Sequence, residues 1–130
     1  MYHILHTTRK DLIMNNFGTF IRGIREIKLA SDKSYSLRQV AYRLEVEPSY
    51  LSKVERGDEP NPSENFVKKL AFDLGQDENI LLAMVGKISS ELKDIIVKNP
   101  VIFAELLQSL KASPDNAILR IVREVKDGNW

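Results

Sequence analysis

The sequence predicts an all-α fold, and three observations carry that prediction. Apolar residues recur at three- and four-residue steps along almost the whole chain, which is the periodicity of amphipathic helices. The alternating pattern that is typical of strands is nearly absent. Serine, aspartate, proline and glycine punctuate the apolar stripes at the places where helices start and stop. We therefore expect a series of short helices joined by tight turns.

Five helices are expected in the first part of the chain, and most have a recognisable start or stop. Ser36 can cap the second helix, with Gln39 three residues later, and Pro48 suits the first turn of the third. Gly57 is a typical stop for that third helix. The expected ranges are 16–29, 37–44, 48–56, 61–74 and 77–85. The residues expected to face inward include Phe17, Phe20, Ile21, Ile24 and Ile27 in the first helix, Val40, Ala41 and Leu44 in the second, Leu51 and Val54 in the third, and Phe66, Val67, Leu70, Ala71 and Leu74 in the fourth.

After Gly86 the spacing of the apolar residues changes, and we place a domain boundary there. A narrow stripe ends before Asn99, and Pro100 and Pro114 can each start a further helix. The residues before Met14 do not join the first helix convincingly. The expected organisation is an N-terminal arm (1–13), a five-helix domain (14–86) and a helical C-terminal element (87–130).

Charge is distributed unevenly, although the net charge of the chain is only +1. Residues 15–57 hold eight Lys/Arg against five Asp/Glu, giving +3, and residues 58–130 hold nine against twelve, giving −3. This asymmetry indicates a basic working half and an acidic remainder. No apolar run approaches the roughly 18 residues that cross a bilayer, and the start lacks the order of a secretory signal. We expect a cytoplasmic protein without a membrane partner.

Metal, cofactor and catalytic sites are not expected. The chain has no cysteine, and its two histidines, His3 and His6, have no carboxylate or thiol cluster beside them. A Ser-His-Asp arrangement would require the first six residues to fold back onto the rest. The glycines are isolated helix stops and not a phosphate-binding loop. The sequence therefore predicts a protein that is not an enzyme and that needs no cofactor or metal.

Residues 36–57 form the pattern that points to a function. They place two short helices on either side of a turn of three or four residues. Ala41 is small where the two helices must come close, and Val46 fills the gap between the turn and the core. Leu51 and Val54 anchor the second helix of the pair and leave its opposite face exposed. Such a face can enter a DNA major groove, which is about 12 Å wide.

The stretch from Phe17 to Leu82 resembles the lambda-repressor/Cro-like (XRE) family of bacterial and phage regulators. The residues that carry the resemblance are Ile21, Ile24 and Arg25 in the first helix, Val40 and Ala41 in the second, 49–57 in the third, and Pro62 and Ser63 at the start of the fourth. The resemblance implies a five-helix, lambda-repressor-like DNA-binding domain, here followed by a C-terminal helical extension. It also implies a sequence-specific transcription regulator.

Position by position, the resemblance also implies roles for single residues. Lys53 can donate hydrogen bonds to guanine O6 and N7. In the family, Glu55 would pair with Arg25 and tie the third helix to the first. Arg43 is expected to be solvated. The expected base contacts are Ser49, Tyr50 and Lys53, and the expected phosphate contacts are Arg38, Gln39, Ser52 and Arg56.

Three features depart from the family pattern. Many relatives carry glycine where this chain has Glu45, and a left-handed backbone there would cost about 1 kcal/mol. A slightly different turn is therefore expected. Leu37 stands where several relatives have a phosphate-binding glutamine, so Arg38 is expected to replace it. The loop 28–35 is longer than usual, and its Lys33 is interpreted as a solvated residue.

The stripes after Gly86 predict a dimer interface. Two recognition helices one DNA turn apart, about 34 Å, would read an inverted-repeat operator and multiply specificity. The simplest function is a homodimeric repressor of double-stranded DNA, although activation through RNA polymerase would use the same parts. Three alternatives stay open: an antitoxin that binds a toxin protein through its C-terminal helices and autoregulates its operon, a controller or phage-type repressor, and a protein-interaction module that no longer binds DNA.

Overall fold

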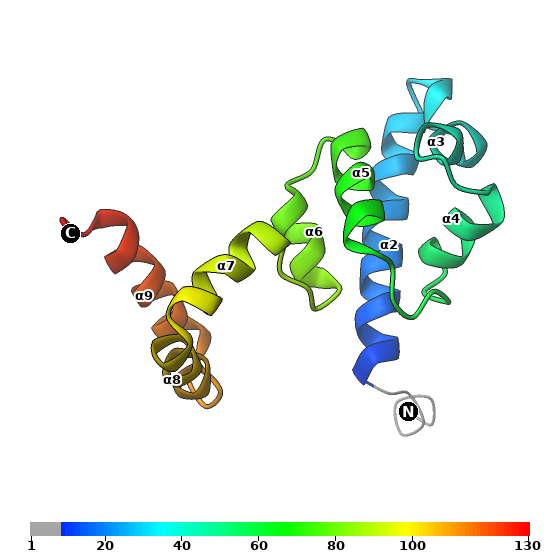
Figure 1. The fold of residues 1–130 in the computed structure, drawn as a ribbon. Coiled ribbons are helices and arrows are strands. Elements are labelled where there is room, and N and C mark those ends of the chain that lie inside the picture. The colour runs from blue at the N-terminus through cyan, green and yellow to red at the C-terminus, as the bar shows by residue number, and fades with distance from the viewer. Residues whose placement is uncertain (1–8) are drawn as a thin grey trace. The chain divides into compact units, whose positions relative to one another are not determined.

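The computed structural model describes the backbone of residues 9–130 and the side chains from residue 16 onward. This part of the chain is helical and contains no strand, which confirms the all-α prediction. It divides into two compact units, of which the first ends at Ser89 and the second is Ser90–Trp130. The elements are α2 (Arg9–Leu29), the 3₁₀ turn η1 (Lys33–Tyr35), α3 (Leu37–Arg43), α4 (Pro48–Glu55), α5 (Glu64–Leu74), α6 (Glu78–Met84), α7 (Ser90–Lys98), α8 (Pro100–Leu110) and α9 (Asp115–Asp127) (Figure 1).

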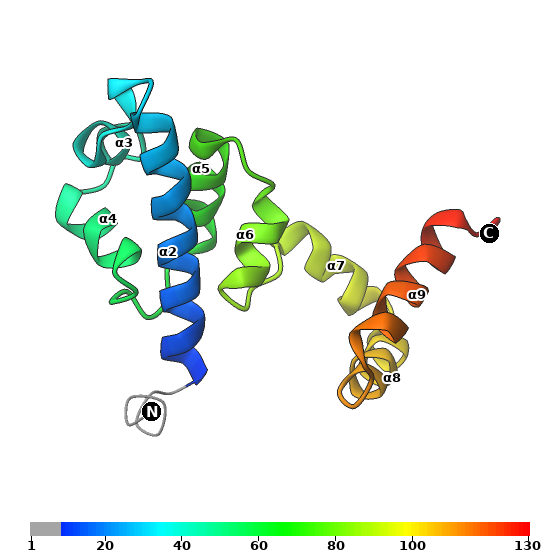
Figure 2. The same cartoon turned by 180° about the vertical axis from the view of Figure 1, so that it is seen from behind.

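In the first unit, α2 is the central helix. It lies between the α3–α4 pair and α6 in both views, with α5 beside it (Figures 1 and 2). Contacts of α2 with η1, α4, α5 and α6 agree with this arrangement. The side chains buried between these helices form one hydrophobic core, consisting of Phe17, Ile21, Val40, Ala41, Leu44, Leu51, Val54, Phe66, Val67, Leu70, Ala71, Leu74, Leu81, Leu82 and Val85.

The first helix differs from the prediction at its start and on its inward face. It begins at Arg9 and not near Asn16, so part of the predicted arm 1–13 is helical, while residues 1–8 lie outside the described part. Phe17 and Ile21 are buried, but the predicted core residues Phe20 and Ile27 are 41% and 76% exposed. Four-residue steps from Phe17 lead through Ile21 to the buried Arg25, and this narrower face is the one that meets the core.

Side-chain caps explain where several helices begin. Ser36 Oγ accepts from the Gln39 N–H at 3.2 Å, as predicted for α3. Asp77 Oδ1 accepts from the N–H groups of the first turn of α6, which confirms the predicted start of that helix. Helix α5 begins at Glu64, later than the expected start at residue 61, because the Ser63 side chain caps it. The Lys87 ammonium donates to the Pro62 carbonyl at 2.6 Å, and this contact holds residue 62 outside the helix.

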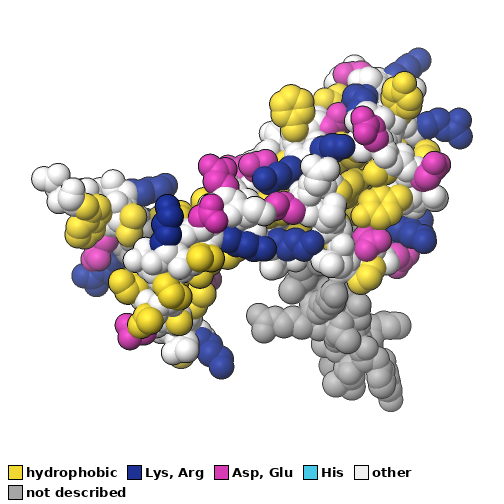
Figure 3. Space-filling model, in the orientation of Figure 1, with side chains coloured by type: hydrophobic (Ala, Val, Ile, Leu, Met, Phe, Trp, Pro, Cys, Tyr) yellow, Lys and Arg dark blue, Asp and Glu magenta, His cyan; other side chains and the backbone are white. Residues whose placement is uncertain are grey.

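The second unit consists of α7, α8 and α9, whose starts at Pro100 and after Pro114 agree with the prediction. The unit begins after Ser89, somewhat later than the boundary expected at Gly86. None of its side chains is buried, and hydrophobic side chains gather on its surface over α8 (Figure 3). None of the described helices is both long enough and apolar enough to span a membrane.

Candidate nucleic-acid interface

Helix α4 has one buried face and one exposed face. Leu51, Val54 and Glu55 are buried against the core of the first unit. Predicted DNA contacts lie on the opposite face at the helical spacing i, i+3, i+4 and i+7. Three of them, Ser49, Lys53 and Arg56, are exposed, and Ser52 is half-buried. The structure therefore brings these four predicted residues together on one surface stripe.

The fifth predicted residue of this segment, Tyr50, is placed differently. It is half-buried, and its ring packs edge-on against Phe66 of α5 with the ring centroids 5.1 Å apart. Burial, with a smaller contribution from the charge of Glu59, raises the pKa of the Tyr50 hydroxyl. Tyr50 thus sits at the margin of the exposed stripe and also anchors the first turn of α4.

A buried ion pair fixes α4 to α2, as the family resemblance implied. The guanidinium of Arg25 donates to both carboxylate oxygens of Glu55, from Nε to Oε2 at 2.7 Å and from Nη2 to Oε1 at 3.0 Å. The remaining Nη1 donates to the Tyr35 carbonyl at 3.2 Å. A bidentate pair of this kind sets both the distance and the rotation of one helix against the other. It therefore determines which residues of α4 face outward.

A glycine allows the close approach of α2 and α4. A Cβ on Gly18 would lie 2.6 Å from the Val54 carbonyl oxygen and 2.5 Å from that of Glu55. Both are backbone atoms at the end of α4, so they cannot swing aside as a flexible side chain would. Glycine inside a helix lowers stability by about 1 kcal/mol relative to alanine. The close approach of the two helices explains why Gly18 is nevertheless present in α2.

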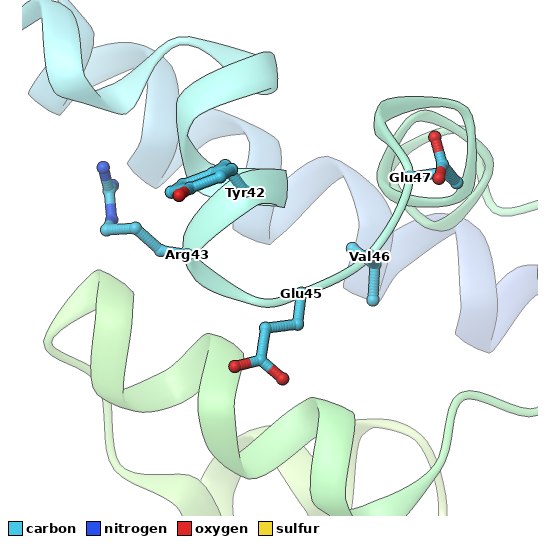
Figure 4. Close-up of a pocket in the computed structure, with 5 residues that line it drawn as sticks. All are labelled: Tyr42, Arg43, Glu45, Val46 and Glu47. Carbon is cyan, nitrogen blue, oxygen red and sulfur yellow. The ribbon is translucent and has the colours of Figure 1, made fainter.

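The turn between α3 and α4 adopts the left-handed conformation although its residue is not glycine. Glu45 has φ of 59°, so the different turn expected from the sequence is not formed. The Val46 N–H donates to the Ala41 carbonyl at 3.0 Å and closes the turn. The Glu45 carboxylate points toward α5 and lies 3.8 Å from Lys69 Nζ (Figure 4). An open hollow of about 560 Å³ is lined here by Tyr42, Arg43, Glu45, Val46 and Glu47.

The long loop before α3 is held in place by α2, α3 and α5. Arg43 Nη1 donates to the Ser34 carbonyl at 2.6 Å, and its Nε and Nη2 donate to the Asp73 carboxylate. The guanidinium also lies over the Tyr35 ring, 5.0 Å from its centroid, and Tyr35 Oη donates to the Asp73 carbonyl. The hydrogen bonds that Arg43 donates to the Asp73 carboxylate raise the pKa of the guanidinium. Arg43 is exposed, as expected, but all three of its donor groups are engaged within the protein.

The start of α3 presents the other predicted DNA contacts. Leu37 is half-buried and packs against the core, whereas Arg38 and Gln39 are exposed. The two exposed side chains follow directly after the clamped η1 turn and the Ser36 cap. Their backbone is thereby fixed, while their side chains remain available for an external partner.

The acidic excess lies in the first unit and not in the tail. Residues 58–89 hold three Lys/Arg against six Asp/Glu, giving −3, whereas residues 90–130 hold six of each and are neutral. The expected acidic remainder is therefore confined to the segment that follows the exposed stripe of α4. The basic segment 15–57 keeps its charge of +3.

Three residues that shape this surface were not predicted. Gly18 had a signal in the sequence, since a glycine within an apolar helical pattern calls for a packing reason. Asp73, which holds Arg43, had no local signal because its partner is thirty positions away. Asp58 accepts a hydrogen bond from Arg56 Nε, with Oδ2 at 3.1 Å. It had no signal in the sequence, because a polar residue is common directly after a helix that ends at a glycine.

Known proteins resemble the segment that contains this surface. Residues 16–79 match the helix-turn-helix domain family. Over 42 residues the chain is 50% identical to the HTH-type transcriptional regulator SlrR of Bacillus subtilis (strain 168), which is 32% of this chain and 28% of that protein. No solved structure gives a significant match. The likeness therefore concerns one segment, and the chain matches less than a third of the length of that relative.

Proposed function

Because residues 16–79 form an XRE-like helix-turn-helix domain, we propose that this protein is a double-stranded-DNA-binding transcription regulator. One observation carries the proposal: the stripe of Ser49, Ser52, Lys53 and Arg56 on the free face of α4, opposite the buried face of that helix. Donors on such a stripe suit both base edges and phosphates. In this proposal α4 enters the major groove.

The exposed side chains divide into base-reading and phosphate-binding groups. We assign Ser49 and Lys53 to base edges, with Tyr50 at the margin of the same contact. The phosphate contacts are Arg38 and Gln39 from α3 and Ser52 and Arg56 from α4. Arg43 has no role at the DNA, since its donors are engaged by Ser34 and Asp73.

The regulator acts as a homodimer through its second unit. Exposed apolar side chains on α8 and α9 leave this unit without a core of its own, which supports burial against a partner. A second copy fits this surface, because a segment with no net charge meets itself without overall repulsion. Two α4 helices would then read an inverted repeat, and occupation of a promoter would repress transcription.

Selection of bound sequences from random duplex DNA tests the proposed function. The expected result is enrichment of an inverted repeat, with binding that weakens with salt by a slope of about −0.9 for each phosphate contact. Lys53→Ala should relax one position in each half-site, whereas Arg38→Ala should weaken all sequences equally. Failure to enrich any sequence, with no salt-dependent binding, would overturn the proposal and favour a protein-interaction module.

An antitoxin is the second candidate, because the same apolar surface of α8 and α9 could cover a foreign protein in place of a second copy. Sedimentation of the full chain separates the two candidates. The dimer proposal predicts a dimer at micromolar concentration, both free and on DNA. A protein that stays a monomer in both states would favour the antitoxin, which would still use α4 to bind its own operator.

A further inference from the structure

Asp58 is held against the last turn of α4 by the backbone. Gly57 has φ of 77°, which reverses the chain at the end of the helix. The Gly57 N–H donates to the Val54 carbonyl at 3.1 Å, and the Asp58 N–H donates to the Lys53 carbonyl at 2.8 Å. These bonds leave the Asp58 side chain, which is 59% exposed, beside the DNA-facing stripe.

The carboxylate of Asp58 binds the guanidinium of Arg56, a side chain that the proposed function assigns to a DNA phosphate. Its Oδ2 accepts a hydrogen bond from Arg56 Nε at 3.1 Å, and Arg56 Nη1 donates to the Ser52 hydroxyl. Arg56 therefore has two of its donor groups engaged by its own chain in the free protein. A carboxylate and a phosphate offer a guanidinium similar paired oxygen acceptors. The two anions would compete for the same side chain.

We propose that Asp58 is an internal competitor of the DNA phosphate for Arg56. The inference rests on the proposed function, since it requires the α4 stripe to bind DNA. Asp58 must release Arg56 before that side chain contacts a phosphate, so it weakens binding to every sequence alike. It does not change which sequence is preferred. Asp58 thereby lowers the affinity for all DNA, while the base-reading residues of α4 continue to determine which sequence is preferred.

Asp58→Asn tests this inference in the full-length protein, with one selected duplex and one scrambled duplex as probes. Exposed ion pairs are worth about 0.2–1 kcal/mol. The variant should therefore bind both duplexes more tightly, by up to about fivefold for each protomer that contacts the DNA, with an unchanged preference between them. The gain should shrink as salt is added, because the Arg56–Asp58 attraction is screened.

Two further variants separate competition from a general loss of negative charge. Glu59→Gln removes a neighbouring carboxylate whose Oε1 accepts from the Asn61 N–H, a bond that an amide oxygen can keep. The Glu59→Gln variant should increase the DNA affinity clearly less than Asp58→Asn does. In an Arg56→Gln background, Asp58→Asn should increase the DNA affinity no more than Glu59→Gln does, because the contested side chain is gone and only the general loss of negative charge remains. Equal gains in both backgrounds, or no gain from Asp58→Asn in the wild-type background, would overturn the inference.

The same measurements distinguish this inference from the proposed function. If the wild-type protein binds the selected duplex and Lys53→Ala relaxes its specificity, the proposed function stands whatever Asp58→Asn does. Absence of salt-dependent binding by the wild-type protein would overturn both. Unchanged thermal unfolding of the Asp58→Asn variant is the control for folding, and it is expected because the Asp58 side chain is exposed.

Discussion

The two units of this protein carry similar apolar patterns but differ in what they do with them. Among the side chains that the structure describes, from residue 16 onward, all fifteen buried hydrophobic ones lie between Phe17 and Val85, in the first unit. The second unit also has apolar residues at helical spacing, although its first stripe is narrower, and none of its residues is buried. Helical periodicity therefore predicts where helices form, but it does not say whether their apolar faces find a partner within the chain.

The difference follows from the number of helices that meet at one place. In the first unit the other helices pack around α2, which contacts α4, α5 and α6. In the second unit, α8 contacts α7, but the three helices do not close around a common centre, so no apolar side chain is enclosed from all sides. Its Leu107 is 55% exposed, whereas Leu70 of α5 is 1% exposed. The first unit therefore encloses its own core, whereas the second leaves its apolar side chains exposed.

The largest effect is expected from the ion pair inside the first unit. Glu55→Gln leaves the Arg25 charge buried without its counter-charge, so the free energy of unfolding should fall by about 3 kcal/mol. Urea unfolding measures this loss. Glu26→Gln is the matched control, because its partner Arg22 is exposed and the loss of their pair should change the free energy of unfolding far less.

Exchange of the two charges refines that prediction. Arg25→Glu combined with Glu55→Arg restores the attraction and should cost less than Glu55→Lys alone. It cannot restore the bond from Arg25 to the Tyr35 carbonyl, so about 1 kcal/mol should remain lost. A Glu55→Lys single variant with the same free energy of unfolding as the wild-type protein would show that the Arg25–Glu55 pair does not hold α4 in place.

A matched pair of leucine substitutions tests the contrast between the units directly. Leu70→Ala should lower the free energy of unfolding by about 3 kcal/mol at every protein concentration, because it leaves a cavity in a closed core. Leu107→Ala should leave the monomer almost unchanged and weaken dimerisation about tenfold in sedimentation equilibrium. A concentration-independent loss from Leu107→Ala would mean that its surface is covered within the same chain.

The smallest effect is expected at the strained turn. Glu45→Gly removes the penalty of a left-handed backbone and should raise the free energy of unfolding by up to about 1 kcal/mol, as measured by thermal unfolding. Loss of the Lys69 contact should subtract little, since both side chains are largely exposed. Glu47→Gly is the control, because its extended backbone gains nothing from glycine. If Glu45→Gly lowers the free energy of unfolding, the contacts of the Glu45 side chain contribute more stability than the left-handed backbone costs.

Local signals in the sequence predicted the elements and much of the candidate interface. The starts of α3, α4, α6, α8 and α9 follow from single capping or proline residues, which act on their own first turn. The spacing of Ser49, Ser52, Lys53 and Arg56 likewise places them on one face of any helix that begins at Pro48. Contacts between residues far apart in the sequence could not be predicted from local signals, and those of Arg43 are the clearest example. A solvated arginine and one clamped by Asp73 look the same in the sequence.

The sequence by itself determined the helical fold, the helix-turn-helix and the stripe on α4, because each depends on residues within a few turns of one another. Only the tertiary structure decided that Phe20 and Ile27 stay outside the core, that Glu45 accepts a left-handed backbone and that Asp58 holds Arg56. These outcomes depend on how elements pack and which charged groups meet. A helical stripe provides an apolar face, and the surrounding helices determine how much of it is buried.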